Sequence, residues 1–264
     1  MSVAGVIFDL DDTLIVEQAQ VGWSLRQVAG LLPDHDPGQV ERVVLDTARA
    51  LWRAGPCLAL CRELGIASFE GLWATFEDDH PVVNDLRDWA RGYRPEVWRA
   101  ALETLGIEDD DLAAAMADLY IECQRGGHPL VDGAAELVTT LQGQRRIGLL
   151  TNGPTDIQRH KFEATGLADF FDAVVISGQV GLGKPDPAVF TYALAQLGTT
   201  ADTTVMVGDN WGRDVVGARS VGMPAVWLAG GRAQPETLTG VTVVDNVGQI
   251  AGLVASWVPT APTT

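Results

Sequence analysis

The sequence is poor in lysine and in positive charge overall. Among its 264 residues only Lys161 and Lys184 are lysines, and 18 basic residues face 35 acidic ones, which gives a formal net charge of −17. Nucleic-acid phosphates and anionic membrane surfaces are bound by clustered Lys and Arg. The composition therefore argues against a nucleic-acid or membrane partner, and it makes the position of each lysine informative.

Cysteines and long apolar runs are also scarce. The three cysteines, Cys57, Cys61 and Cys123, form no C-x-x-C pair and have no neighbouring His cluster. This predicts buried free thiols in a reducing compartment rather than a disulfide framework or a zinc site. No apolar run reaches the roughly 18–20 residues of a membrane span, and the N-terminus lacks the basic segment of a signal peptide. We expect a cytoplasmic protein.

The chain is rich enough in apolar residues to form a folded core. It is 47% hydrophobic and 20% charged, which is close to an ordinary soluble protein and excludes global disorder. Domains usually contain roughly 100–200 residues. The length therefore fits one large domain or two smaller ones.

Strands and helices alternate over much of the sequence. Residues 3–8 form an apolar run that stops at Asp9, as a buried strand with a polar end does. Further strands are predicted at 146–150, 173–176, 204–207 and 225–228, and helices between them at 134–142, 155–165, 186–197 and 212–221. This alternation predicts an α/β fold: a Rossmann-like, mostly parallel sheet with helices on both faces.

Residues 16–128 follow a different pattern. They contain no convincing strand, and the spacing of Val44, Ala48, Leu51 and Trp52 is typical of amphipathic helices. We therefore expect an α-helical domain at 16–128, inserted into an α/β core domain made of 1–15 and 129–264. Hinges between the two are expected near Ile15–Glu17 and Gly126–Asp132.

Polar side chains follow the predicted strands where each one ends. Asp9 and Asp11 follow the first, Thr151 the second and Asp209 a later one, while Lys184 lies in a loop beyond another. Because the carboxyl ends of parallel strands meet at one edge of a sheet, these residues should converge. Carboxylates and a lysine together suit a divalent cation and a phosphoryl group.

These residues fall into motifs that resemble those of the haloacid dehalogenase-like (HAD) hydrolase superfamily. Residues 9–13 read D-x-D-x-T, Thr151 follows a strand, and Lys184 stands in a G-K-P-D-P segment. Asp209 and Asp214 lie in G-D-x₄-D. All four motifs occur in family order over positions 9–214, and the helical insertion is placed like the cap of C1-capped, phosphatase-type members.

The resemblance implies a role for each of the first two acids. Asp9 would attack phosphorus and form an aspartyl-phosphate. Asp11 would protonate the leaving oxygen and then deprotonate the water that hydrolyses the intermediate. Dehalogenases of the superfamily lack an acid at this second position, so Asp11 favours a phosphatase.

The remaining motif residues would bind the metal and the phosphoryl group. Mg²⁺ would be held by Asp9, the backbone carbonyl of Asp11 and Asp209, with Asp214 supporting it. A phosphate ester repels a carboxylate nucleophile, so neutralising groups are needed. The resemblance assigns this role to the cation and to Lys184, which would pair with Asp9 and the phosphoryl oxygens. Thr151 would hydrogen-bond a phosphoryl oxygen, helped by the backbone near Asn152.

The expected function is a Mg²⁺-dependent phosphatase of a small phosphorylated metabolite, acting as a monomer or a homodimer. A phosphomutase or dehalogenase of the same superfamily is an alternative, as is a non-catalytic module like the phospho-receiver domains. Four residues of the expected cap are candidates for selectivity: Arg26, Trp52, Arg53 and His80.

Overall fold

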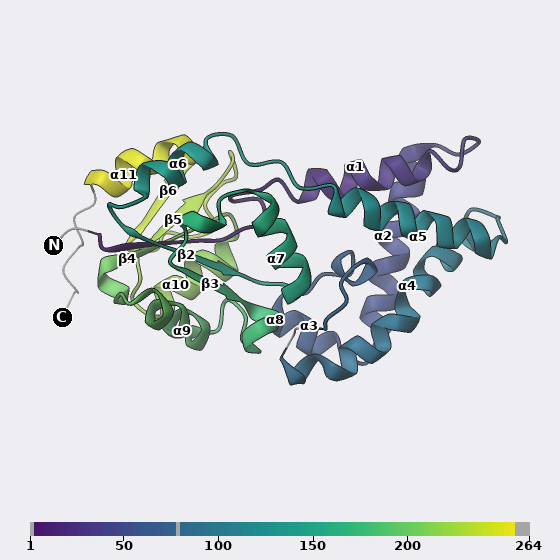
Figure 1. Ribbon diagram of the computed structural model, residues 1–264, viewed down its shortest axis with the longest axis horizontal. Coiled ribbons are helices and arrows are strands. Elements are labelled where there is room, and N and C mark those ends of the chain that lie inside the picture. The colour runs from purple at the N-terminus through teal and green to yellow at the C-terminus, as the bar shows by residue number, and fades with distance from the viewer. Residues whose placement is uncertain (1–2, 78–79, 257–264) are drawn as a thin grey trace.

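A parallel sheet forms the centre of one half of the molecule (Figure 1). The computed structural model describes residues 3–77 and 80–256. The sheet has six strands in the order β3-β2-β1-β4-β5-β6, and every neighbouring pair is parallel. The strands are β1 (Gly5–Phe8), β2 (Arg146–Thr151), β3 (Ala173–Ile176), β4 (Thr204–Gly208), β5 (Ala225–Leu228) and β6 (Val241–Val244). The predicted α/β class is confirmed.

The order of the strands determines where a site can form. The first strand of the chain, β1, lies between β2 and β4, and the sheet grows in opposite directions on its two sides. Ligands of such open sheets bind beyond the carboxyl ends of the strands at this reversal point. Asp9 follows β1 and Asp209 follows β4, so both acids lie there.

Helices cover both faces of the sheet, as predicted. Alternate residues of β1 point to opposite faces: Val6 and Phe8 pack in one apolar cluster and Ile7 in another. The helices of these layers are α6 (Ala134–Leu141), α7 (Thr155–Ala164) and α11 (Ile250–Ser256) on the first face, and α9 (Pro187–Leu197) and α10 (Gly217–Ser220) on the second. The predicted helix at 212–221 is a π-helical turn, η5 (Trp211–Val216), followed by α10.

The other half of the molecule is helical. It contains α1 (Gln18–Ala29), α2 (Pro37–Ala54), α3 (Leu58–Leu64), α4 (Asn84–Thr104) and α5 (Asp110–Arg125), with short 3-10 turns at Glu70–Leu72 and Pro81–Val83. We call residues 18–125 the helical part. Its own apolar cluster is rich in aromatic residues: Trp52 lies edge-on to Tyr93 at 5.0 Å between ring centroids.

Two short joining segments connect the helical part to the sheet, and they run side by side. The first ends at Glu17 and the second begins at Gly126. The backbone N–H of Val16 donates to Pro129 (2.8 Å), and that of Val131 donates to Leu14 (2.9 Å). The helical part also touches the sheet half directly, since the Ser177 hydroxyl donates to the Leu64 carbonyl at 2.6 Å. The chain therefore leaves and re-enters the sheet half at one place.

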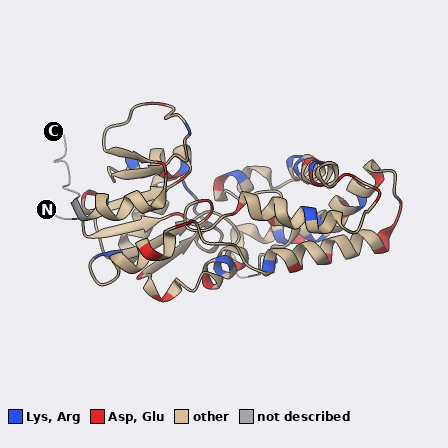
Figure 2. Cartoon of the chain, turned by 90° about the horizontal axis from the view of Figure 1, so that it is seen from above, with Lys and Arg blue, Asp and Glu red and all other residues tan. Residues whose placement is uncertain are grey.

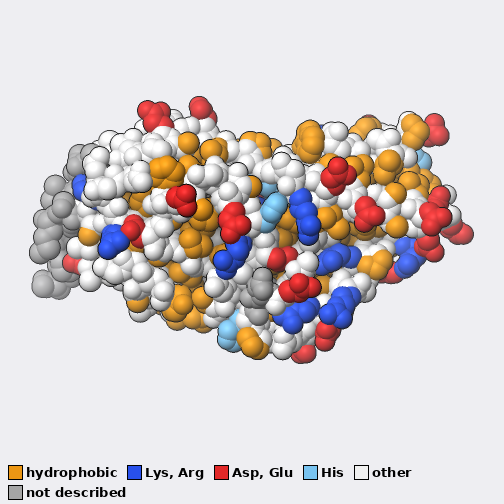
Figure 3. Space-filling view, viewed as in Figure 1, with side chains coloured by type: hydrophobic (Ala, Val, Ile, Leu, Met, Phe, Trp, Pro, Cys, Tyr) orange, Lys and Arg blue, Asp and Glu red, His pale blue; other side chains and the backbone are white. Residues whose placement is uncertain are grey.

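The surface is mixed in charge. Asp and Glu are spread over both halves, and the Lys and Arg side chains on the face in Figure 3 stand among acidic ones (Figures 2 and 3). No helix within residues 3–77 and 80–256 has the length and hydropathy needed to cross a bilayer. All three cysteines are free, but only Cys61 is buried, so the expectation of three buried thiols is wrong for Cys57 and Cys123, which are half-buried.

Candidate active site

The chain turns sharply after β1, and this turn places the first motif. The backbone N–H of Asp9 donates to Val207 in β4 (2.9 Å), which continues the sheet by one residue. The Leu10 carbonyl then accepts from the N–H groups of Thr13 and Leu14, and Asp12 adopts a left-handed backbone with φ 54°. The turn takes the chain out of the sheet, so the side chains of the first motif lie at the end of β1.

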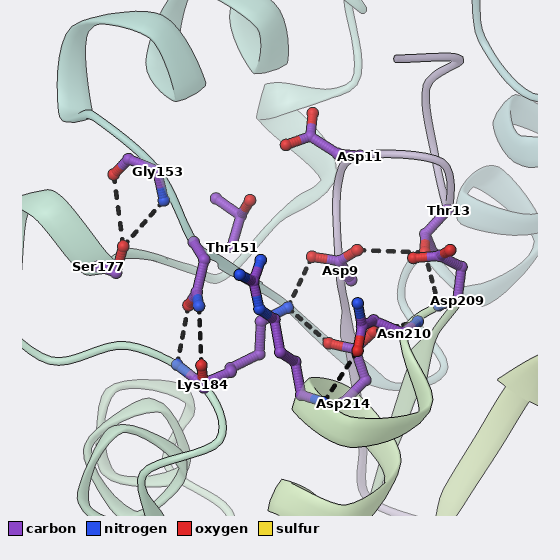
Figure 4. Close-up of polar contacts among 12 residues, drawn as sticks. Asp9, Asp11, Thr13, Thr151, Gly153, Ser177, Lys184, Asp209, Asn210 and Asp214 are labelled. Atoms are coloured by element: carbon purple, nitrogen blue, oxygen red, sulfur yellow. Dashed lines mark hydrogen bonds and ion pairs between the residues drawn. The ribbon is translucent and has the colours of Figure 1, made fainter. Parts of the chain in front are cut away.

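The Lys184 ammonium joins two carboxylates at this edge. Its Nζ lies 2.6 Å from Asp9 Oδ1 and 2.7 Å from Asp214 Oδ1, and all three side chains are buried (Figure 4). Burial raises the pKa of Asp9 to about 8, although Lys184 acts in the opposite direction. Burial opposes the charge of Lys184, but Asp214 and Asp9 raise its pKa above the usual value, so this cation stays charged.

Asp214 reaches this position because β4 ends in glycine. A Cβ at Gly208 would overlap the Asp214 carboxylate, so no larger residue fits there without movement. The second oxygen of Asp214 accepts from the backbone N–H of Asn210 at 2.9 Å. The fourth motif thus folds back on the strand that precedes it.

Thr13 connects the first motif to the fourth. Its hydroxyl donates to Asp9 Oδ2 (3.3 Å) and accepts from the backbone N–H of Asp209 (3.1 Å). Asp209 is partly buried, and desolvation raises its pKa to about 6, against the influence of Arg232. Thr13 was not among the expected site residues, although the D-x-D-x-T spacing includes it.

Three acids can share one cation. Asp9, Asp209 and Asp214 each offer a carboxylate oxygen within 4.8 Å of the others. Oxygen ligands of this type suit Mg²⁺. Each oxygen of Asp214 accepts one hydrogen bond, from Lys184 or from the Asn210 N–H, and each oxygen of Asp9 accepts one, from Lys184 or from Thr13. Asp209 is contacted at Oδ2 by Arg232 at 3.3 Å.

At the end of β2, Asn152 contacts the backbone of Lys184 and Thr151 contacts α7. The Asn152 side chain accepts from the Lys184 N–H and donates to the Lys184 carbonyl, both at 2.8 Å. The Thr151 hydroxyl accepts from Gln158 Nε2 at 2.9 Å. Asn152 thus holds the backbone of Lys184 in place, a role that the sequence did not reveal.

Asp11 lies apart from Asp9, Asp209 and Asp214. Its carboxylate points away from Asp9 (Figure 4) and accepts from two side chains of α7, Lys161 at 3.0 Å and Gln158 at 2.7 Å. Burial raises the pKa of Asp11 above its usual value, while Lys161 lowers it. Of the predicted site residues, Asp9, Lys184, Asp209 and Asp214 are gathered in one group, and Asp11 belongs to a second group.

The second group contains the other lysine. Lys161 Nζ lies 2.9 Å from Glu17 Oε1 and 3.9 Å from Glu70 Oε1, in addition to Asp11. Burial alone would raise the pKa of Glu17, but Lys161 and the adjacent His128 lower it to about 2. Burial raises the pKa of Glu70 to about 8. Only the scarcity of lysine pointed to Lys161 in the sequence.

A cavity of about 210 Å³ opens between the two groups and the helical part. Besides the acids, Asn152 and Lys184, it is lined by Asn210, Arg213 and five residues of the helical part: Gln18, Gly65, Ala67, Phe69 and Glu70.

None of the expected selectivity residues lines this cavity. Arg26 forms a surface ion pair with Glu41 (2.9 Å), Trp52 is buried in the helical part, and Arg53 and His80 are exposed. That expectation was wrong in detail because helical spacing alone does not show which face looks toward the sheet.

The fold and the four motifs define a class of protein. Residues 3–222 match the family model of haloacid dehalogenase-like hydrolases. The chain belongs to this family, and it is a hydrolase acting on phosphoric monoesters.

Several proteins of known name are similar to this chain. A phosphoserine phosphatase of Thermus thermophilus is 37% identical over 229 residues, which are 84% of this chain and 87% of that one. The human N-acylneuraminate-9-phosphatase is 38% identical over 231 residues, 86% of this chain and 82% of that one. The solved structure of a Bacillus subtilis protein described as a HAD-hydrolase, YfnB, bound to magnesium, has the same fold, with a TM-score of 0.67 and 22% identity over 97% of this chain and 100% of that one.

Proposed function

We propose that the protein is a Mg²⁺-dependent phosphatase that hydrolyses a small phosphorylated metabolite through an aspartyl-phosphate. The observation that carries this proposal is the contact of Lys184 with Asp9 and Asp214 beside Asp209. A carboxylate nucleophile needs its own charge and that of the phosphoryl oxygens offset. The lysine and a cation held mainly by Asp9, Asp209 and the Asp11 carbonyl would supply this.

The reaction has two displacements at phosphorus. In the first, an oxygen of Asp9 bonds to phosphorus, the ester P–O bond breaks, and the leaving oxygen takes a proton from Asp11. In the second, water attacks the aspartyl-phosphate, its proton goes to Asp11, and the bond between phosphorus and Asp9 breaks to release phosphate. The Thr151 hydroxyl and Lys184 would hold phosphoryl oxygens throughout, while Asn152 fixes Lys184. Bound Mg²⁺ would add positive charge at those oxygens.

We propose that residues 16–128 form a cap domain over a core of 1–15 and 129–264. The helical part contributes residues such as Phe69 and Glu70 to the cavity wall, and a closed wall excludes water from the reacting phosphate. The half-buried free thiols of Cys57 and Cys123 fit a reducing, cytoplasmic compartment.

The cavity favours a small leaving group. Its volume of about 210 Å³ lies below the roughly 300–1,000 Å³ of pockets for drug-sized ligands. Two relatives of this chain are named as phosphatases, one of phosphoserine and the other of an N-acylneuraminate 9-phosphate. Of these, we expect phosphoserine to be the better substrate.

A phosphatase assay with and without Mg²⁺ tests the proposal. A panel of phosphorylated amino acids, sugars, nucleotides and hydroxy acids is incubated with the wild-type protein and with the Asp9→Asn variant, and free phosphate is measured. Absence of Mg²⁺-dependent release from every compound would contradict the proposal, and equal activity of Asp9→Asn would contradict the mechanism. Reaction in ¹⁸O-water separates hydrolysis, which labels the phosphate, from transfer within a sugar phosphate, as a phosphomutase performs.

A further inference from the structure

Lys161 is an unusual residue for a protein interior. Its side chain is completely buried, and within the described part of the chain its ammonium faces three carboxylates, those of Asp11, Glu17 and Glu70. A buried ion cluster adds little to stability compared with apolar residues of the same volume. Its presence next to Asp11 therefore calls for a role other than stabilising the fold.

Both oxygens of Asp11 are held by the same helix. Lys161 contacts Oδ1 at 3.0 Å, and Gln158 Nε2 contacts Oδ2 at 2.7 Å. Residues three apart on a helix share one face, so α7 presents the two donors side by side. A carboxylate restrained at both oxygens has a fixed direction.

Lys161 is itself fixed in place by the segments that join the two halves. Glu17 lies on the first segment, and its Oε1 is 2.9 Å from Lys161 Nζ. His128 lies on the second segment, with Nε2 2.9 Å from Glu17 Oε2, and its ring is stacked at 15° on Trp73. The lysine therefore cannot change direction without disturbing Glu17 and His128.

We propose that Lys161 is a positioning residue: anchored by Glu17, its ammonium fixes the direction of the Asp11 carboxyl group and so controls proton transfer to the leaving oxygen. The proposal rests on the proposed phosphatase function. It assigns no contact between Lys161 and the substrate, since Asp11 lines the cavity whereas Lys161 is buried behind its wall.

Leaving groups of different basicity test this role. The alkoxide of phosphoserine needs a proton as it departs, whereas 2,4-dinitrophenolate does not. The measured quantity is kcat/KM, because it covers only the steps up to formation of the aspartyl-phosphate. In Lys161→Met we expect kcat/KM for phosphoserine, or for the best alkyl phosphate in the panel, to fall about 50-fold, within the range of general acid catalysis. For 2,4-dinitrophenyl phosphate we expect a fall of about 3-fold or less. Lys161→Arg should restore part of the loss.

Arg159→Met is the matched control. It removes one positive charge from an exposed position of the same helix, where the Arg159 guanidinium donates to Gln179 at 3.5 Å. We expect it to change neither kcat/KM by more than about 2-fold, as is usual for surface substitutions.

Three outcomes overturn the proposal. One is an equal loss for both esters in Lys161→Met, which indicates general disruption of the site. Another is no loss for either ester, or a gain. The third is a wild-type protein inactive on both esters, which refutes the phosphatase function itself and the proposal with it. If Lys161→Met does not fold, Glu17→Gln decides instead: it keeps Lys161 but removes the anchor, and we expect a selective loss of about 5-fold or more for the alkyl ester.

Discussion

The two lysines lie in two contrasting regions of the molecule. Lys184 meets Asp9 and Asp214 at the reversal point of the sheet, and all three residues belong to the α/β half. Lys161 meets Asp11 together with Glu17 and Glu70, so its partners come from the joining segment and the helical part as well. In our proposal one cation serves the reacting centre, while the other connects Asp11, the proposed general acid, to the segments around it. Equal burial and equal charge thus do not imply equal roles.

The largest effect should come from Asp9, the proposed nucleophile beside Lys184. Asp9→Asn keeps the size of the side chain but removes the attacking carboxylate. We expect Mg²⁺-dependent phosphate release to fall about 10⁴-fold or more, as for other covalent nucleophiles. The control is the far-ultraviolet circular dichroism of the variant, which should match the wild type. A variant that retains a tenth of the activity would show that Asp9 is not the nucleophile.

Removing Lys184 should affect both activity and stability. Lys184→Met leaves Asp9 and Asp214 buried without their cation, at a cost of about 3–5 kcal/mol in the free energy of unfolding. Activity should fall about 10²–10³-fold. Urea unfolding with and without Mg²⁺ measures the first effect, and Mg²⁺ should reduce it because the ion compensates the same acids. Lys184→Arg serves as the charge-retaining comparison; an unchanged unfolding curve for Lys184→Met would contradict this account.

The stability of the metal-free protein should depend on pH. The pKa of Asp9 is raised to about 8, that of Glu70 to about 8 and that of Asp209 to about 6. The folded state then holds protons that the unfolded state has already released, so stability decreases as pH rises from about 5 to 8. Each kcal/mol lost should lower Tm by about 2–4 °C.

Mg²⁺ should reverse this trend, because it replaces protons at Asp9 and Asp209. Thermal melts in EDTA and in Mg²⁺ at pH 5, 6, 7 and 8 measure both effects. We expect the stabilisation by Mg²⁺ to grow with pH. A Tm that does not vary with pH in EDTA would contradict the assignment of protons to these buried acids.

The smallest effect is expected at a surface ion pair. Arg26 pairs with Glu41 at 2.9 Å, but its side chain is 50% exposed. Such pairs contribute about 0–1 kcal/mol, and Arg26 does not line the cavity. Arg26→Ala should leave kcat/KM within about 2-fold of the wild type in the same assay. A larger loss with phosphoserine would restore Arg26 as a selectivity residue.

The sequence predicts the Lys184 region far better than the Lys161 region. Alternating strands and helices give the sheet, and polar residues at strand ends give Asp9, Asp209 and Lys184, since the geometry of parallel sheets brings such ends together. β6 is harder to recognise, because it is an edge strand of only four residues that follows a long loop. Three of its four residues are partly exposed or exposed.

The Lys161 group could not be derived in the same way. Its members lie on a helix, a joining segment and a 3-10 turn, and only the packing of the helical part on the sheet half brings them together. Glu17 and Glu70 belong to no motif, and the sequence spacing of Lys161 and Asp11, 150 residues, carries no signal. The rarity of lysine drew attention to Lys161 but did not indicate its partners.

The pairing of the two joining segments has a topological consequence. Because Val16 and Pro129 are hydrogen-bonded neighbours, everything between them is, for the sheet, one long loop with adjacent ends. Insertions with adjacent ends can be exchanged without changing strand register. The same sheet half could thus be combined with a different helical part. A chimera joined at Val16 and Pro129 would test whether the helical part sets the choice of substrate while the sheet half sets the chemistry.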